Sequence, residues 1–369
     1  MGKRIGFGGL LVILSACGGS VDTTPAPSEQ RTPASQNNGD QGLYIPTKPT
    51  VPDHVAEGVG TPSALAMTAD RVVFTTHDTV VAGERVAAGA LFVADKRVGP
   101  ALLISVDRQG ASFDALTTDG TTAFVATSDA RLLGAPVAGG TTTTIATLSA
   151  PAVALATSGN YVYFATSAGS VARVAKIGGT SEPLATITGA IRGLEADDVA
   201  VYVATGAAEE TPAGIVRVAL DGGALTVLSS GSEPCAMVRN GRSLFWTSLA
   251  ASAVTGTTPK LDNGAVLRLS LDGGAVATVA SGAFAACAIA ADQDSLYFAT
   301  TVPTALRVKS GSSSGAPSAG LGLMRAPIAG GEPVAIAQAS KALAQPGAVA
   351  VDASHVYWLT ESAVLRLAK

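Results

Sequence analysis

A short run of β-branched and aromatic residues that ends in Thr or Ser recurs seven times along the chain. The runs occupy positions 72–76, 123–127, 162–166, 201–205, 244–248, 297–300 and 356–360. Such runs favour a pleated, half-buried surface, so each predicts a β-strand. Their regular recurrence indicates an internal repeat.

Other positions recur around these strands. A preceding strand carries a small residue at one fixed position: Ala64, Ala115, Ala154, Gly193, Ala236, Ala288 and Ala348. The turn between the two strands holds Asp119, Ser158, Asp197, Asn240, Asp292 and Asp352, residue types that bond to their own backbone in turns. A third strand often carries Arg, and five Gly-Gly pairs follow third strands as tight turns. Four strands in units spaced 39 to 60 residues apart are typical of β-propeller blades.

The two ends of the repeat region predict how the ring closes. The last unit, 345–369, has room for only three strands. The segment 54–57, which precedes the first unit, has the pattern of a fourth strand. We therefore expect an all-β, seven-bladed β-propeller over 51–369, closed by the N-terminal strand, so that no sheet edge is left unpaired. A six-bladed ring would leave one complete unit over.

The N-terminus carries the marks of an export signal. Lys3 and Arg4 form a positive start, an apolar stretch follows, and small residues precede Cys17. The segment Leu-Ser-Ala-Cys resembles a bacterial lipobox. The resemblance implies a lipoprotein signal peptide over 1–16 and a lipid anchor on Cys17. A plain signal peptide with an incidental cysteine is the alternative.

The residue after this cysteine is Gly18 and not Asp, which by the sorting rule of such lipoproteins implies an outer-membrane location in the cell envelope. Residues 17–50 are rich in Pro, Ser, Thr, Gln and Asn. Such a composition buries too little apolar surface to offset its ordering entropy, so this segment is interpreted as a disordered, flexible linker.

Two strand segments and two strand–turn segments resemble YWTD-type propeller repeats, and more broadly NHL and bacterial lipoprotein propellers. They are Phe245-Trp246-Thr247-Ser248, Tyr357-Trp358-Leu359-Thr360, 215–223 and 266–274. The resemblance covers nearly all of 51–369. Thr or Ser stands where the YWTD pattern has Asp, so no carboxylate or metal role at that position is expected. The class includes receptors, scaffolds and a few enzymes, so it implies a fold and not one activity.

Composition argues against several classes of function. Charged residues make up 14% of the chain and the net charge is -4, with no basic stripe for nucleic acid. Only His54, His77 and His355 are present, and no nucleophile–base pair or phosphate loop accompanies them. His77 is interpreted as a loop histidine and not as a metal ligand. No catalytic residue, metal site or cofactor is expected.

Several candidate residues occupy the same position of the repeat, near the start of the first strand, and this position varies from unit to unit. Its members are Ser63, Asp114, Val153, Arg192, Cys235, Cys287 and Gly347. Cys235 and Cys287 fall in neighbouring blades, so they form either a disulfide or two small buried thiols. This position borders one mouth of the channel, beside the connections 77–88, 206–213, 249–263 and 301–321, and Arg307 and Lys309 lie in the last of these.

Asp114, Arg192, Glu195 and Arg239 place charges on inner strands, where an unpaired charge is costly. They form either a polar pocket at the channel mouth or pairs with each other and with channel water.

These features favour a monomeric, envelope-anchored binding or scaffolding lipoprotein. Its contact face would be the rim of long loops, and its partner a protein or a glycan. One alternative is a propeller enzyme of lactonase- or lyase-like type that uses Asp114, Glu195 or Arg192. Another is a purely structural envelope protein. Propeller enzymes gather several acids and histidines around the channel, and this chain has few, which favours the binding module.

Overall fold

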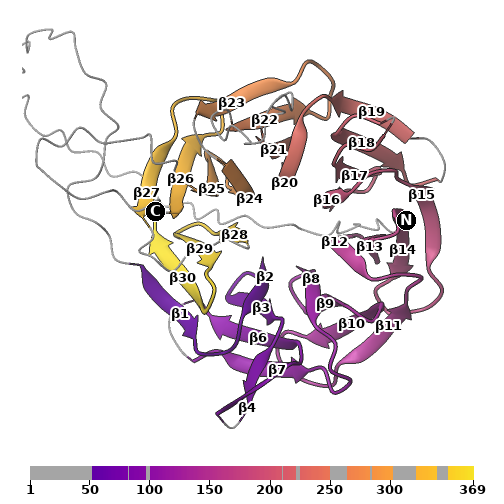
Figure 1. The fold of residues 1–369 in the computed structure, drawn as a ribbon, viewed down its shortest axis with the longest axis vertical. Helices are drawn as coiled ribbons and strands as arrows, with labels where there is room; N and C mark the ends of the chain where they lie inside the picture. Colours follow the sequence, from indigo (N-terminus) through magenta and orange to yellow (C-terminus); the bar gives the residue numbers. More distant parts are fainter. Residues whose placement is uncertain are drawn as a thin grey trace, which may run out of the picture.

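The computed structural model describes residues 52–81, 83–96, 100–209, 211–221, 225–249, 264–282, 285–301, 321–338 and 348–369. Over these ranges the chain is all-β, and seven four-stranded antiparallel sheets surround a central axis (Figure 1). The first strands of neighbouring blades contact one another around the whole ring. The predicted seven-bladed β-propeller is therefore confirmed. Among the described residues, no helix has the length and apolar character needed to cross a membrane.

The blades follow the chain in order. Blade 1 contains β2 (Pro62–Met67), β3 (Arg71–Thr76), β6 (Ala90–Asp95) and β7 (Leu102–Val106). Blade 2 contains β8 (Phe113–Thr118), β9 (Thr122–Thr127), β10 (Arg131–Pro136) and β11 (Thr143–Thr147). Blade 3 contains β12 (Ala152–Ser158), β13 (Tyr161–Thr166), β14 (Ser170–Ala175) and β15 (Glu182–Thr186). Blade 4 contains β16 (Ile191–Ala196), β17 (Ala200–Thr205), β18 (Gly214–Ala219) and β19 (Leu225–Ser230).

The remaining blades continue this order. Blade 5 contains β20 (Glu233–Asn240), β21 (Ser243–Leu249), β22 (Gly264–Ser270) and β23 (Ala277–Gly282). Blade 6 contains β24 (Ala285–Ala291), β25 (Ser295–Thr301), β26 (Leu321–Pro327) and β27 (Val334–Gln338). Blade 7 contains β28 (Val349–Val351), β29 (His355–Leu359), β30 (Ala363–Ala368) and β1 (Asp53–Glu57). A short hairpin, β4 (Thr79–Val81) with β5 (Glu84–Val86), lies within the connection 77–88 that the sequence analysis interpreted as a loop.

Strand β1 closes the ring as predicted. It pairs antiparallel with β30, so the outermost strand of blade 7 comes from the opposite end of the folded domain. The Arg366 guanidinium adds hydrogen bonds of 3.3 and 3.2 Å to the Asp53 carboxylate across this junction. A six-bladed ring is thereby excluded.

Apolar side chains between the sheets form the core. Trp246, Tyr297 and Tyr357 on second strands are completely buried. In three blades the hydroxyl that ends the second strand accepts a backbone N–H of the turn that follows: Thr127 from Arg131 at 2.9 Å, Thr166 from Ser170 at 3.1 Å and Thr360 from Ala363 at 2.9 Å. This is where the YWTD pattern has Asp, and here the hydroxyl serves the local turn.

The two faces of the ring differ. We call the face where first strands begin the loop face, and the opposite face, which holds the turns between first and second strands, the turn face. Turn-face aspartates accept two backbone N–H groups each, as Asp352 does from Ser354 and His355 at 2.8 and 2.9 Å. Such bonds hold the turn in place.

Three of these turn-face aspartates also meet a lysine from the next blade. Lys96 lies 3.2 Å from Asp352, and Lys176 lies 3.0 Å from Asp119. Lys369, at the C-terminus, pairs with Asp292. Each lysine directly follows a third strand, so these pairs tie adjacent blades together around the turn face.

Candidate functional site

Six of the seven first strands open with a β-bulge on the loop face. In blade 4, for example, Ile191 pairs with Thr205 and Gly193 with Ala204, so Arg192 is the extra residue without a partner in the ladder. The register shifts at the same place in six blades. The bulged residues, which we call the bulge ring, are Ser63, Asp114, Val153, Arg192, Cys235 and Cys287. The seventh member, Gly347, lies outside the described residues.

The fourth strands carry a second set of bulges, which differs from the bulge ring in the side chains at the bulged position. Each described fourth strand also carries one extra residue, and it is always a branched aliphatic residue: Val55, Ile104, Ile145, Leu184, Leu228, Val279 and Ile336. These side chains are buried or partly buried between blades. The bulge ring is formed by the same kind of one-residue bulge, but its side chains are hydroxyl, acidic, apolar, basic and sulfur-containing. Bulges re-aim side chains, so the ring presents varied chemistry around one mouth of the channel.

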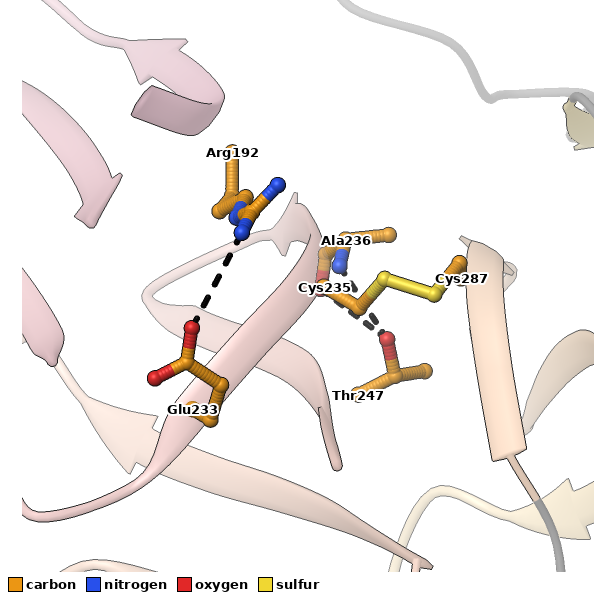
Figure 2. The surroundings of a disulfide bond; sticks show 6 residues. All are labelled: Arg192, Glu233, Cys235, Ala236, Thr247 and Cys287. Atoms are coloured by element: carbon orange, nitrogen blue, oxygen red, sulfur yellow. Dashed lines mark hydrogen bonds and ion pairs between the residues drawn. A yellow bond between two sulfur atoms is a disulfide. The ribbon is translucent and has the colours of Figure 1, made fainter. Parts of the chain in front are cut away.

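Two members of the ring are bonded to each other. Cys235 and Cys287, in blades 5 and 6, form a disulfide with their Cα atoms 4.8 Å apart (Figure 2). Both residues are bulged out of their strands, at the same position of neighbouring blades. The sequence left a disulfide and buried thiols as alternatives; the structure shows the bond, with Cys287 exposed.

Arg192 lies in the next blade at the same level (Figure 2). Its guanidinium is 3.9 Å from the Glu233 carboxylate, and its side chain is 47% exposed. Gly206 keeps this space open, because an added Cβ would lie 3.2 Å from the Glu233 Oε1 and 3.5 Å from the Arg192 Nε. The pair is an open, solvated contact and not a tight hydrogen-bonded ion pair.

Asp114 lies in blade 2. The Ser112 hydroxyl donates to its carboxylate at 2.6 Å, and the His77 Nδ1 lies 3.8 Å away. The histidine is too far for a hydrogen bond. Asp114 therefore remains a largely solvated carboxylate on the loop face.

The four candidate charges do not share one pocket, and Glu195 interacts with Arg239, as in the second of the two alternatives. Asp114 and Arg192 lie on the loop face two blades apart, whereas Glu195 and Arg239 lie deeper, toward the turn face. Arg239 donates to the Gly241 carbonyl, in the turn of its own blade, at 3.0 Å. Its backbone also hydrogen-bonds the Glu195 carboxylate across the blade boundary.

Burial raises the pKa of Glu195 to about 7, although the positive charge of Arg239 opposes this rise. The carboxyl therefore exists in both protonation states near neutral pH. The remaining candidates, Arg307 and Lys309, lie outside the described residues.

The acids of the enzyme alternative, Asp114 and Glu195, are not brought together. Among the described residues, no three His, Cys, Asp or Glu side chains are grouped in a way that could hold a metal ion. Asp114 and Glu195, the two acids of the enzyme alternative, lie in different blades and at different depths. The bulges were missed at the level of sequence: a recurring aliphatic residue followed by Ala or Ser accompanies those of the fourth strands, but the bulge ring has no constant residue type to mark it.

Comparison with known proteins bears on the fold alone. No protein-family model matches the chain, and no curated protein matches it. Solved structures do match. A structure of the mitotic checkpoint complex is similar with a TM-score of 0.61 at 10% identity over 90% of this chain and 98% of that one. YCF48 bound to D1 peptide is similar with a TM-score of 0.58 at 10% identity over 89% and 99%. The fold is a β-propeller.

A third similar structure is the extracellular domain of the hybrid two-component system BT4673 from B. thetaiotaomicron, with a TM-score of 0.60 at 10% identity. The match covers 86% of this chain and 39% of that one, so the propeller spans well under half of that protein. At such identities these likenesses show a shared fold.

Proposed function

We propose that this protein is a binding module held in the cell envelope by a lipid anchor on Cys17, and that its loop face contacts a protein partner. The bulge ring is the observation that carries the proposal. Six repeats keep a β-bulge at the channel mouth, while the side chain of the bulged residue changes from blade to blade. A position that served only packing would keep one residue type, as the fourth-strand bulges do.

The contrast between the two faces supports this assignment. On the turn face, Asp119, Asp292 and Asp352 accept turn N–H groups and pair with lysines of the next blade. Charges of the bulge ring are exposed and only loosely paired. Function is commonly carried by the variable side of a rigid scaffold. One propeller of similar fold was solved with a bound peptide, which makes a polypeptide partner a natural expectation for this chain.

A cross-linked pull-down from envelope extract tests the loop face. The bait is the full chain, and the test variant combines Asp114→Ala with Arg192→Ala. The matched control combines Asp198→Ala with Arg242→Ala, which removes one exposed acid and one exposed base from the turn face. A partner captured by the wild type and the control but lost by the loop-face variant supports the proposal. Equal capture by all three baits contradicts it.

The anchor is tested separately. Cys17→Ser should move the chain from the membrane fraction to the soluble fraction and abolish lipid labelling. Lipid labelling that persists in this variant would show that the anchor is elsewhere.

A further inference from the structure

Three consecutive members of the bulge ring form an arc of ordered chemistry. Asp114 in blade 2 is acidic, Val153 in blade 3 is apolar, and Arg192 in blade 4 is basic. All three are accessible: the side chains of Asp114 and Arg192 are 32% and 47% exposed, and Val153 is 43% exposed. Together the three side chains form a surface with an apolar centre between an acidic and a basic end, so a partner can make both ionic and apolar contacts with it.

The charges of this arc make only loose contacts with their neighbours in the ring. The His77 imidazole lies 3.8 Å from the Asp114 carboxylate, and the Glu233 carboxylate lies 3.9 Å from the Arg192 guanidinium. The blade-to-blade pairs on the turn face are different, since Lys176 and Asp119 approach to 3.0 Å and are 19% and 20% exposed. The donors of Arg192 and the carboxylate of Asp114 therefore retain capacity for an external partner.

The length of the arc limits what can bridge it. First strands of neighbouring blades approach within 8 Å between Cα atoms. Two such steps amount to roughly 15 Å, the length of four to five residues of extended chain. A free amino acid is too short to reach both charges, whereas an extended peptide reaches both and passes over Val153.

We propose that the arc Asp114–Val153–Arg192 binds an extended peptide segment that carries a basic and an acidic residue about four positions apart, with small apolar residues between them. The basic residue pairs with Asp114, and the acidic residue pairs with Arg192. This inference rests on the proposed function and names the chemistry of the partner at the same face.

Fluorescence anisotropy with three labelled peptides tests the charge pattern. The peptides are Lys-Ala-Val-Ala-Glu, Lys-Ala-Val-Ala-Lys and Glu-Ala-Val-Ala-Glu, each with blocked ends, and the protein is the purified full chain at low salt. We expect the mixed-charge peptide to bind about 10-fold more tightly than either like-charge peptide, since two exposed charge pairs contribute modestly. The preference should shrink at high salt.

Charge reversal supplies the matched controls. Asp114→Lys should shift the preference to the peptide with two Glu, and Arg192→Asp to the peptide with two Lys. The double variant Asp114→Arg with Arg192→Asp should restore the preference for the mixed peptide, because an extended peptide can lie along the arc in either direction. Unchanged melting temperatures verify that the variants remain folded.

The inference is overturned if the wild type binds no peptide, binds all three equally, or if the reversals leave the preference unchanged. Its failure is distinct from failure of the proposed function. Loss of an extract partner in the loop-face variant together with no peptide preference refutes the arc and leaves the binding module standing. A clear peptide preference together with equal capture by all three baits supports the arc and contradicts the loop face as the contact site of the extract partner.

Discussion

Removal of the bond between Cys235 and Cys287 should weaken the propeller by a predictable amount. The two cysteines are separated by 52 residues of chain. Closing a loop of this length removes conformational entropy from the unfolded chain worth about 4 kcal/mol at 25 °C. With an unfolding entropy of about 2 cal/mol/K per residue over about 320 residues, this loss corresponds to a fall in melting temperature of roughly 6 °C.

Scanning calorimetry on a Cys17→Ser background measures this effect, since only two of the three cysteines then remain. The double variant Cys235→Ser with Cys287→Ser should melt lower than the oxidised parent and at the same temperature as the reduced parent. Thiol titration should find no free thiol before reduction and two after it. The double variant should not respond to reductant.

One result would refute the reasoning. If the parent shows two free thiols after reduction but an unchanged melting temperature, the bond does not restrict the unfolded chain as assumed. A fall of much more than 6 °C would mean that the bond also holds blades 5 and 6 in register, which a loop-entropy argument does not include.

Two further predictions concern pH. Burial raises the pKa of Glu195 to about 7 from 4.5, so the folded chain keeps a proton that the unfolded chain releases, and stability falls as the pH rises between these values. Glu195→Gln should therefore raise the free energy of unfolding in urea by up to about 3 kcal/mol at pH 8 and change little at pH 4; a loss of stability at pH 8 would contradict this. For Asp352, burial alone would raise the pKa, but the backbone N–H groups of Ser354 and His355 and the charge of Lys96 outweigh it and lower the pKa to about 2. The resulting stabilisation is present above about pH 4 and is lost as the pH falls through 2, so Asp352→Asn should cost about 2 kcal/mol at pH 7 and much less at pH 2.

The local parts of the fold were predictable because their causes are local. Runs of β-branched and aromatic residues form strands, and Asp or Gly at fixed positions forms the turns between them. The seven-fold repeat of four-strand units then predicted the blades of a propeller. The fourth-strand pattern of residues 54–57 identified β1 as the closing strand. The short hairpin β4–β5 was missed, since its two strands of three residues each carry little pattern.

The candidate site was predictable only in part. The sequence identified the variable position at the channel mouth, and with it Asp114, Arg192 and the two cysteines. It did not reveal that these residues are bulged, because a bulge is a register shift between two strands and is not encoded in either strand alone. It also grouped Arg239 with Arg192, although the two lie toward opposite faces.

The sequence by itself therefore determined the architecture of this protein: seven blades, an N-terminal closing strand and one variable position per blade. Only the tertiary structure decided which residues from different repeats meet: the bond between Cys235 and Cys287, the pairing of Lys96 with Asp352, and the arc from Asp114 to Arg192. The physical reason is ring closure. It brings first strands of neighbouring blades within 8 Å of each other, although their residues are dozens of positions apart in the chain.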